Sequence, residues 1–552
     1  MKYLSKLAQS GETTINLPNL VCTKIGEGSI KPYSFPKKTI DNDLDIKILS
    51  GGTVLTENEP LSFTAYNNVF TLSFYDYETD EEIEGIIDSF GLHFQYSYDK
   101  EEWFDWDSET RNITIENGST VYLKGDNPNG INSEDKWIYF HFEENEVGNG
   151  GIIECHGNIM SLLGKYEKDI PCEYCFASMF YQCTSLTTTP ELPATSLSDR
   201  CYNGMFYGCT SLTTAPKLPA TTLTVHCYYA MFKGCSSLTT ALELPATTLA
   251  DSCYGSMFLF CKSLTTAPDL PATTLAEKCY NAMFQGCSSL TTAPELLATT
   301  LADSCYAYMF YDCTSLTTAS ELLATTLAEK CYYAMFGGCT SLTTAPKLPA
   351  TTLTVHCYYA MFQGCSSLTT APELPATTLA DSCYDSMFEG CTSLVTAPEL
   401  PATTLAEKCY YAMFGGCTSL TTAPELLATT LTESCYAYMF EGCTSLVTAP
   451  ELPATALTDS CYAWMFEGCT SLVTAPELLA TTLTDSCYHG MFFICTSLSS
   501  VTCLSESGIN VNNSTSNWLK NVSTNGVFTK TANATWPSGA NGIPNGWTIN
   551  NA

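Results

Sequence analysis

The sequence predicts a mixed α/β repeat solenoid of 26-residue coils, preceded by a β-sandwich-type domain. Twenty-six of the 30 cysteines fall in two columns of period 26, which begin at Cys175 and Cys183. Thirteen of the 15 methionines form a third column, which begins at Met179. Residues 41–150 instead alternate short apolar and polar stretches between Gly, Asn and Asp. A fixed period of 20 to 50 residues is typical of a solenoid, in which each unit buries its apolar face against its neighbours.

The spacing within one unit predicts a short helix, because Cys175, Met179 and Cys183 lie at i, i+4 and i+8. Gly occupies the eighth position in nine of the thirteen copies and suits a helix end, since it adopts positive φ easily. The Thr-rich segment that follows, S-L-T-T-A in most copies, predicts a strand that the next Pro ends. Two further Leu columns, at Leu192 and Leu197 in the first copy, return the chain to the core.

The unit C-Y-x-x-M-F-x-G-C-T-S-L-T-T-A-P-E-L-P-A-T-T-L resembles the repeat of the BspA-like leucine-rich repeat surface proteins. The usual unit of that family is a shorter A-F-x-x-C-x-x-L-x-x-[IV]-x-[IL]-P coil, and the present unit has Pro where the family often has an open strand position. The resemblance covers about residues 175–504 and implies a leucine-rich-repeat-like solenoid. It also implies adhesion, because such arrays are known as adhesins and as surface components of phages that infect gut anaerobes.

The flanks of the array predict four further segments. Residues 1–40 hold six lysines and two acidic residues, and we expect them to attach the protein to a partner; the alternative is a leader to the first strand. Residues 41–150, with stretches such as TLSFYDY and TVYLKGD, read as the strands of a β-sandwich-like domain. Residues 151–174 are expected to cap the start of the thirteen repeats at 175–504. Residues 505–552 are expected to form a small C-terminal β cap, similar to that of related repeat proteins.

The cysteine columns allow two interpretations, a disulfide ladder or reduced core thiols. Residues eight apart in one helix lie about 12 Å apart along its axis, whereas a disulfide requires Cα atoms within about 7 Å. Thirteen is an odd number, so pairing between neighbouring coils would leave one thiol over in each column. We expect reduced thiols that act as small buried residues. Cys172 and Cys175 form a lone CxxC near His156, from which we expect no zinc site.

The charge and the motifs exclude several functional classes. The chain has 57 acidic and 23 basic residues, a net charge of −34, which repels phosphate backbones and anionic headgroups. We therefore expect no nucleic-acid partner. No run of about 18 apolar residues occurs, so we also expect no membrane insertion. The six histidines fit no HExxH pattern, and no Gly-Lys-Ser phosphate loop is present. The sequence therefore predicts a protein that is not an enzyme and that has no cofactor or metal.

The acidic column at unit position seventeen begins at Glu191. It is expected to be a solvated stripe rather than a calcium site, because calcium needs several oxygen ligands at each site.

Binding residues in a repeat array are expected where the copies differ. Unit positions three, four and seven vary, and we expect them on the outside of the coil, together with a near-constant Tyr at position two. A surface rich in Tyr, Asn, Ser and Gly is typical of adaptable recognition; simple stacking of exposed tyrosines between coils is the alternative. The candidate ligand-binding residues are Tyr202, Tyr207, Tyr228, Tyr229, Tyr333, Tyr359, Tyr411, Trp464 and His489.

These observations and the resemblance predict a phage virion surface protein, a fibre or decoration component that attaches to the host. The first residues lack the apolar core of a secretory signal, which favours a virion because particles assemble in the cytoplasm and leave by lysis. The expected partners are a host cell-surface glycan or protein, other virion proteins through the N-terminal region, and a second copy of the chain. The alternative is a bacterial cell-surface adhesin.

Overall fold

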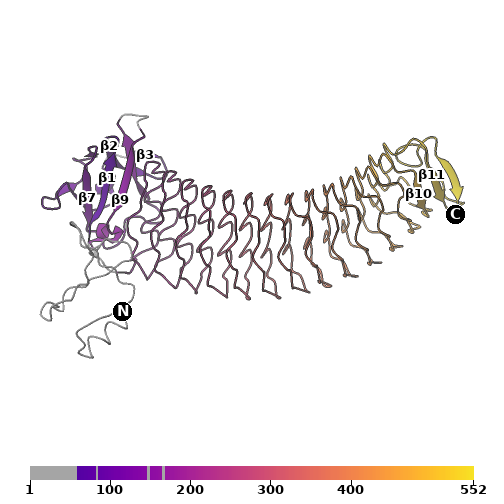
Figure 1. The fold of residues 1–552 in the computed structure, drawn as a ribbon, viewed down its shortest axis with the longest axis horizontal. Coiled ribbons are helices and arrows are strands. Elements are labelled where there is room, and N and C mark those ends of the chain that lie inside the picture. Colours follow the sequence, from indigo (N-terminus) through magenta and orange to yellow (C-terminus); the bar gives the residue numbers. More distant parts are fainter. Residues whose placement is uncertain (1–58, 83–84, 146–149, 165–167) are drawn as a thin grey trace, which may run out of the picture. The chain divides into compact units, whose positions relative to one another are not determined.

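The computed structural model describes residues 59–82, 85–145, 150–164 and 168–552, which belong to one compact unit of the chain. It contains a strand-rich β domain followed by an array of coils that succeed one another in chain order (Figure 1). The segment predicted for attachment, 1–40, and the first part of the predicted β domain lie outside the described residues.

The strands of the β domain are β1 (Leu61–Tyr66), β2 (Phe70–Asp76), β3 (Glu81–Glu82), β4 (Phe94–Ser97), β5 (Phe104–Trp106), β6 (Ile113–Ile115), β7 (Thr120–Gly125), β8 (Ile138–Glu144) and β9 (Ile152–His156). Its helices are α2 (Ile86–Ser89) and the 3-10 helix η1 (Ile159–Leu163). The strands at the C-terminal end of the array are β10 (Ser500–Cys503), β11 (Val527–Lys530) and β12 (Thr548–Asn551).

The β domain consists of two antiparallel sheets. One has the strand order β5-β4-β7-β1-β9, and the other has the order β3-β2-β6 with β8 also paired to β2. Aromatic side chains from the two sheets contact each other: the ring of Phe63 in β1 lies 5.2 Å from that of Phe140 in β8, edge to face. Phe74 in β2 stacks on Phe94 in β4 at 5.1 Å. The predicted strand-rich N-terminal domain is therefore confirmed, with its core between the two sheets.

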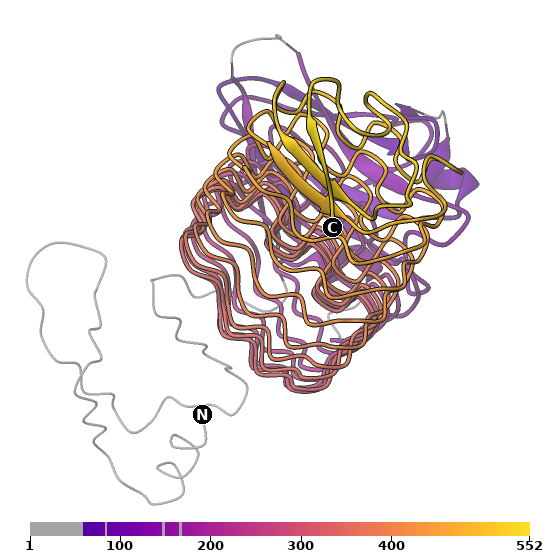
Figure 2. The ribbon, with the colours of Figure 1, turned by 90° about the vertical axis from the view of Figure 1, so that its right-hand side faces the viewer.

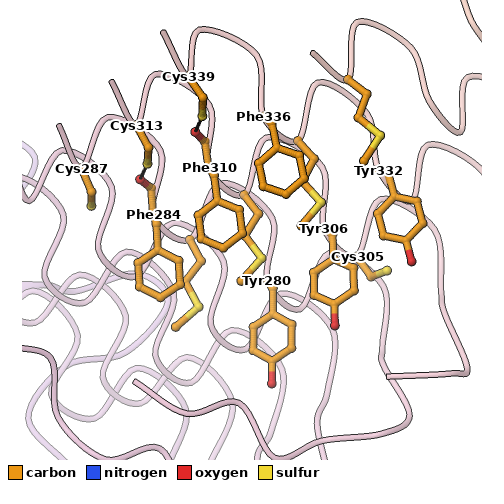
Figure 3. Packing of buried hydrophobic residues seen from close by; sticks show 14 of the residues in the cluster. Tyr280, Phe284, Cys287, Cys305, Tyr306, Phe310, Cys313, Tyr332, Phe336 and Cys339 are labelled. Atoms are coloured by element: carbon orange, nitrogen blue, oxygen red, sulfur yellow. Dashed lines mark hydrogen bonds between the residues drawn. The ribbon is translucent and has the colours of Figure 1, made fainter. Parts of the chain in front are cut away.

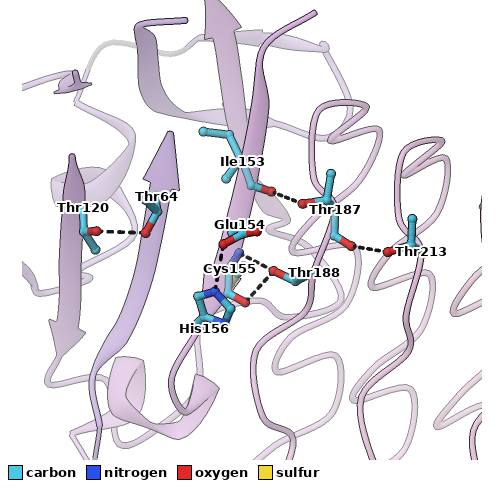
Figure 4. Close-up of polar contacts among 9 residues, drawn as sticks. All are labelled: Thr64, Thr120, Ile153, Glu154, Cys155, His156, Thr187, Thr188 and Thr213. Atoms are coloured by element: carbon cyan, nitrogen blue, oxygen red, sulfur yellow. Dashed lines mark hydrogen bonds and ion pairs between the residues drawn. The ribbon is translucent and has the colours of Figure 1, made fainter. Parts of the chain in front are cut away.

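Strand β9 belongs to both regions of the molecule and lies beyond the boundary predicted at residue 150. It pairs antiparallel with β1, and Ile153 forms a parallel bridge with Leu186 of the first coil. The Thr187 N–H donates to the Ile153 carbonyl at 2.9 Å, and the Thr188 hydroxyl both accepts from and donates to the backbone of Cys155 (Figure 4). The β domain thus supplies the edge on which the first coil is built.

The helix predicted for each coil is wrong, since residues 168–552 contain no helix, and the class mixed α/β does not hold for the array. A chain of tight turns, here called the turn segment, takes its place. In the first coil the Ala177 N–H donates to the Tyr174 carbonyl at 2.7 Å, which closes a turn. The next N–H, of Ser178, donates to the Asn203 carbonyl of the following coil at 2.8 Å. Alternate N–H groups therefore close turns within a coil and bond to the next coil.

The sequence pattern misleads because the turn segment repeats every four residues. Cys175, Met179 and Cys183 are all buried, as they would be on a helix of 3.6 residues per turn. What differs is the backbone, since every fourth residue has positive φ, for example Ser178 at 54°. Gly338 has a φ of 71°, so Gly at the eighth position adopts the left-handed conformation of a turn and does not end a helix.

The core of the array consists of stacked rows of identical side chains (Figure 3). The rings of Tyr280 and Tyr306 stack at 5.8 Å, and those of Phe284 and Phe310 stack at 5.7 Å. The Leu column that begins at Leu186 is fully buried in every copy. All 29 described cysteines are free thiols, and all but Cys172 are buried. The predicted core columns therefore form the core, except that the column that begins at Leu197 is only partly buried in several copies.

The Thr-rich segment forms less strand than predicted. Neighbouring coils share single parallel bridges in this segment, such as Thr240 with Thr266, until Thr474 pairs with Ser500 of β10. Strands β10, β11 and β12 then form a parallel sheet, so the predicted C-terminal cap at 505–552 continues the stack (Figure 2).

Candidate functional site: the turn face of the array

The outward side chains of the turn segments form one continuous surface, here called the turn face. Counting Cys175 as position one of the first coil, positions one, two, five, six and nine are buried in the repeats. Positions three, four, seven and eight differ between copies; small side chains there are buried, such as Ala334 at position four, whereas aromatic ones such as Tyr308 are partly exposed. The alternation of inward and outward pairs follows from the four-residue repeat of the turns.

Two of the nine predicted binding residues are wrong. Tyr202 and Tyr228, at position two, are each 1 % exposed, and their rings stack on each other at 5.8 Å with an interplanar angle of 4°. Burial raises the pKa of both phenols well above the usual range. Position two belongs to the inward pair of each turn, so this Tyr column is core rather than ligand-binding surface.

The other seven predicted residues lie on the turn face. Tyr229 is 36 % exposed, and the remaining six are partly buried. They do not form a single group: Tyr207 contacts Tyr181 and the Lys233 ammonium at the N-terminal end, and Tyr229 contacts His226. The remaining five fall into two clusters further along the array.

The central tyrosine cluster spans three successive coils and consists of Tyr308, Tyr311, Tyr333 and Tyr359. Tyr333 stacks on Tyr359, with ring centroids 4.5 Å apart and an interplanar angle of 10°. Tyr308 contacts both Tyr333, at 5.2 Å, and Tyr311, at 5.7 Å. Burial and the neighbouring Tyr333 raise the pKa of Tyr308 to about 12, so all four phenols remain neutral hydrogen-bonding groups at physiological pH.

The C-terminal aromatic row spans four coils and consists of Tyr411, Tyr438, Trp464, His489 and Phe493. Tyr411 and Tyr438 lie 5.3 Å apart, and Tyr438 stacks on Trp464 at 6.2 Å. Trp464 in turn contacts His489 at 4.8 Å and the edge of Phe493 at 5.7 Å. Burial lowers the pKa of His489, which keeps this end of the row neutral. The row is thus an unbroken series of ring contacts along the array.

Four carboxylates border the C-terminal aromatic row: Asp385, Glu389, Glu441 and Glu467. Asp385 is 7 % exposed, and its carboxylate accepts a hydrogen bond from the Ser386 hydroxyl at 2.9 Å. Burial raises the pKa of Asp385 to about 6. Burial and the charge of Glu389 raise the pKa of Glu441, and burial and the charge of Glu441 raise that of Glu467. None of the four forms an ion pair with another described residue.

Aromatic rings beside uncompensated carboxylates suit particular ligands. Ring faces stack on sugars or on flat side chains, and carboxylates accept hydrogen bonds from hydroxyl or ammonium groups.

In the part of the chain that the structure describes, no group of three His, Cys, Asp or Glu side chains could hold a metal ion. The same residues include no helix that is long and apolar enough to cross a membrane. The acidic column at position seventeen is exposed from Glu191 to Glu477.

Sequence reasoning missed Tyr308 and Tyr438, which join the rings of neighbouring coils. Both stand at position four, where most copies carry Gly, Ala or Ser. The aromatic residues of neighbouring coils stand at position three in some copies and at position four in others, as in Tyr411 followed by Tyr438. The sequence therefore contains the aromatic residues of the row, but they can be recognised as a row only when positions three and four of neighbouring units are compared.

The comparison with known families covers the array. The chain matches the family model described as BspA type Leucine rich repeat region, with six copies, over residues 172–317, 303–444 and 414–533. No curated protein matches the chain.

Proposed function

Because the chain belongs to the BspA-type leucine-rich repeat family, we propose that it is a surface adhesin without enzymatic activity that binds its ligand on the turn face. The family resemblance supports adhesion, and the division of labour within each coil supports the location. Unit positions one, two, five, six and nine repeat nearly the same residues and build the core, whereas positions three, four, seven and eight differ between copies. A surface that varies on a constant scaffold suits recognition.

The observation that carries the proposal is the C-terminal aromatic row with its bordering carboxylates. Its rings are partly exposed and are supported by ring contacts with their neighbours, so ordering them on binding costs little conformational entropy. The carboxylates supply hydrogen-bond acceptors beside the ring faces. The proposed ligand is a glycan or protein of the host cell surface.

The proposed carrier of this adhesin is a phage particle, as a fibre or decoration component. Arrays of similar sequence are known from phages as well as from bacteria, and the bacterial cell surface is the alternative. The proposed further partners are other virion proteins, bound through the N-terminal region, and a second copy of the chain. Immunogold labelling with an antibody against the array distinguishes the carriers, because it marks purified particles in one case and whole cells in the other.

The binding proposal is tested with the full chain and the Tyr438→Ala/Trp464→Ala double variant. Removing two adjacent ring faces should weaken adhesion to host cells at least about tenfold, as is usual for aromatic anchors. Val447→Ala is the control, since Val447 is 55 % exposed and follows the turn segment of the coil that contains Tyr438. Equal adhesion by the double variant and the control would remove the aromatic row as the site. Incubation with host polysaccharides tests the absence of enzymatic activity, because released products would contradict it.

A further inference from the structure

Cys172 and Cys175 lie where the chain enters the array, and their sulfur atoms are neighbours. A Cβ atom added to Gly130 would stand 2.2 Å from the sulfur of Cys172 and 3.3 Å from that of Cys175. The two sulfurs are therefore at most 5.5 Å apart, the sum of these distances. The two thiols also share a side-chain hydrogen bond.

The repeats show independently that this contact is built into the coil. Cys172 occupies the residue three before position one, where other coils carry Thr, Ser or Ala. Wherever that residue is Thr, its hydroxyl contacts the thiol at position one. The pairs are Thr224 with Cys227, Thr354 with Cys357, Thr432 with Cys435, Thr458 with Cys461 and Thr484 with Cys487. In the first coil the same geometry places a second thiol, instead of a hydroxyl, against the cysteine.

The environment makes one thiol of the pair accessible and reactive. Cys172 is the only described cysteine that is not buried, whereas Cys175 is fully buried. The hydrogen bond from Cys175 lowers the pKa of Cys172, and burial raises the pKa of Cys175. Thiolate therefore forms on the member of the pair that a small molecule can reach. Residues three apart in a turn have Cα atoms within about 7 Å, which suits a disulfide.

We propose that Cys172 and Cys175 are a modification site that forms an intramolecular disulfide by exchange with a small-molecule disulfide such as oxidised glutathione. The Cys172 thiolate attacks one sulfur of the small disulfide, forms a mixed disulfide and releases one thiolate. Cys175 gives its proton to that thiolate and attacks the sulfur of Cys172, which breaks the mixed disulfide and expels the second small thiolate. This thiolate takes up the proton that Cys172 released to solvent. Two cysteines are oxidised by two electrons, and the small disulfide is reduced to two thiols.

The disulfide would lie at the junction between the β domain and the array. The Asn132 N–H donates to the Cys175 carbonyl at 3.2 Å, and the Asn132 side-chain amide donates to the Ala177 carbonyl at 2.7 Å. Oxidation would covalently close the turn that the β domain holds through Asn132. The cysteine columns of the later coils stay reduced under the same conditions, because their thiols are buried.

The test treats the folded full chain with oxidised glutathione, blocks free thiols in denaturant and analyses the peptides by mass spectrometry. The peptide with Cys172 and Cys175 should resist blocking at both sulfurs and be lighter by two hydrogen atoms than the reduced peptide. A stable glutathione adduct on Cys172 with Cys175 still blockable would overturn the proposal. Unmodified thiols at both positions would also overturn it.

Two variants make the result specific. Cys175→Ser should stop at the glutathione adduct on Cys172, because the resolving thiol is missing. Thr354→Cys gives a matched second pair with Cys357 in a later coil, and mild denaturant should expose it to the same oxidation. If the Thr354→Cys pair oxidises while Cys172 and Cys175 do not, the turn permits a disulfide but the proposed site is wrong. A thermal melt of each variant confirms that it is folded.

Discussion

The thiol of Cys313 donates a hydrogen bond of 3.0 Å to the carbonyl oxygen of Phe284 in the preceding coil. The same bond joins successive coils along the array, as from Cys339 to Phe310 (Figure 3). Another is the bond from Cys365 to Phe336. This position needs a small, mostly apolar side chain that also donates a hydrogen bond, and Cys satisfies both requirements. The second cysteine column is therefore explained by bonding between coils, without any disulfide.

The first prediction concerns this bond. Cys313→Ala removes a buried sulfur and its donor, and it should destabilise the array by about 2 kcal/mol through the cavity and the lost hydrogen bond. Cys313→Ser keeps a donor aimed at the Phe284 carbonyl, so it should be less destabilising. Denaturant unfolding followed by circular dichroism measures both variants. A Ser variant that is less stable than the Ala variant would show that the sulfur packs but that its hydrogen bond contributes nothing.

The second prediction concerns unit position eight, where the residue has a positive φ. Ile494 has a φ of 60°, a conformation that is costly for a β-branched residue, whereas nine other copies have Gly there. Ile494→Gly should therefore stabilise the last coils by about 1 kcal/mol, since the side chain is already 37 % exposed. Hydrogen exchange of the amides near Cys495 gives the local opening free energy.

Ile494→Ala is the control for this effect. Ala loses nearly the same side-chain contacts as Gly but keeps a Cβ atom in the left-handed conformation. The Gly variant should therefore be the more protected of the two. Equal protection would mean that the positive φ at this position stores no strain.

The third prediction concerns the pH dependence of the coil that contains Asp385. Its pKa is raised to about 6 in the folded protein, so the folded state binds its proton more tightly than the unfolded chain does. The free energy of unfolding therefore falls as the pH rises from about 4 to about 6, by about 3 kcal/mol, and stays level above that. Asp385→Asn removes this dependence and should stabilise the coil at pH 7.5 but not at pH 4.

Hydrogen exchange of the amides from Cys383 to Cys409, corrected for intrinsic rates at each pH, measures this difference. Glu373→Gln is the matched control, because Glu373 is an exposed carboxylate in the preceding coil. It should show no comparable change between the two pH values. The assignment fails if Asp385→Asn and the parent chain lose protection in parallel as the pH rises.

Comparison of sequence and structure shows which features a repeat reveals. The columns at Cys175, Met179 and Leu186 correctly identify the core, because a constant side chain in every copy stacks on itself. Spacing alone could not separate a helix from turns of four residues, since both bury the same positions. The error over Tyr202 has the same origin, because the prediction took position two for an exposed column.

The candidate site could be predicted only in part from the sequence, for a related reason. Variation between copies marks the outward positions, and seven of the nine predicted residues lie there. Contacts between coils depend on how positions three and four of neighbouring turns align, which the sequence of one unit does not contain. The role of β9 was hidden as well, because pairing of Ile153 with Leu186 depends on the β domain and the array together.

The last prediction deletes five whole repeats, residues 201–330. The deletion joins Arg200 to Cys331 and keeps every column in register, because the bonds between coils are made by the backbone and by constant side chains. Phe180, which stacks on Phe206 at 5.1 Å, would then stack on Phe336. The shortened chain should fold, with its thiols still protected from alkylation. It should also keep its adhesion, because the C-terminal aromatic row is intact while Tyr207, Tyr229 and Tyr308 are lost.

Deletion of residues 201–213, half a repeat, is the control for register. It brings outward positions of one coil against inward positions of the next, so the rows of Tyr, Phe and Cys are interrupted. This variant should expose thiols to alkylation and aggregate, although it removes one tenth as many residues. If both deletions fold equally well, the stacking of like side chains does not determine the register. If the long deletion folds but no longer adheres, the ligand site lies in the first half of the array rather than on the C-terminal aromatic row.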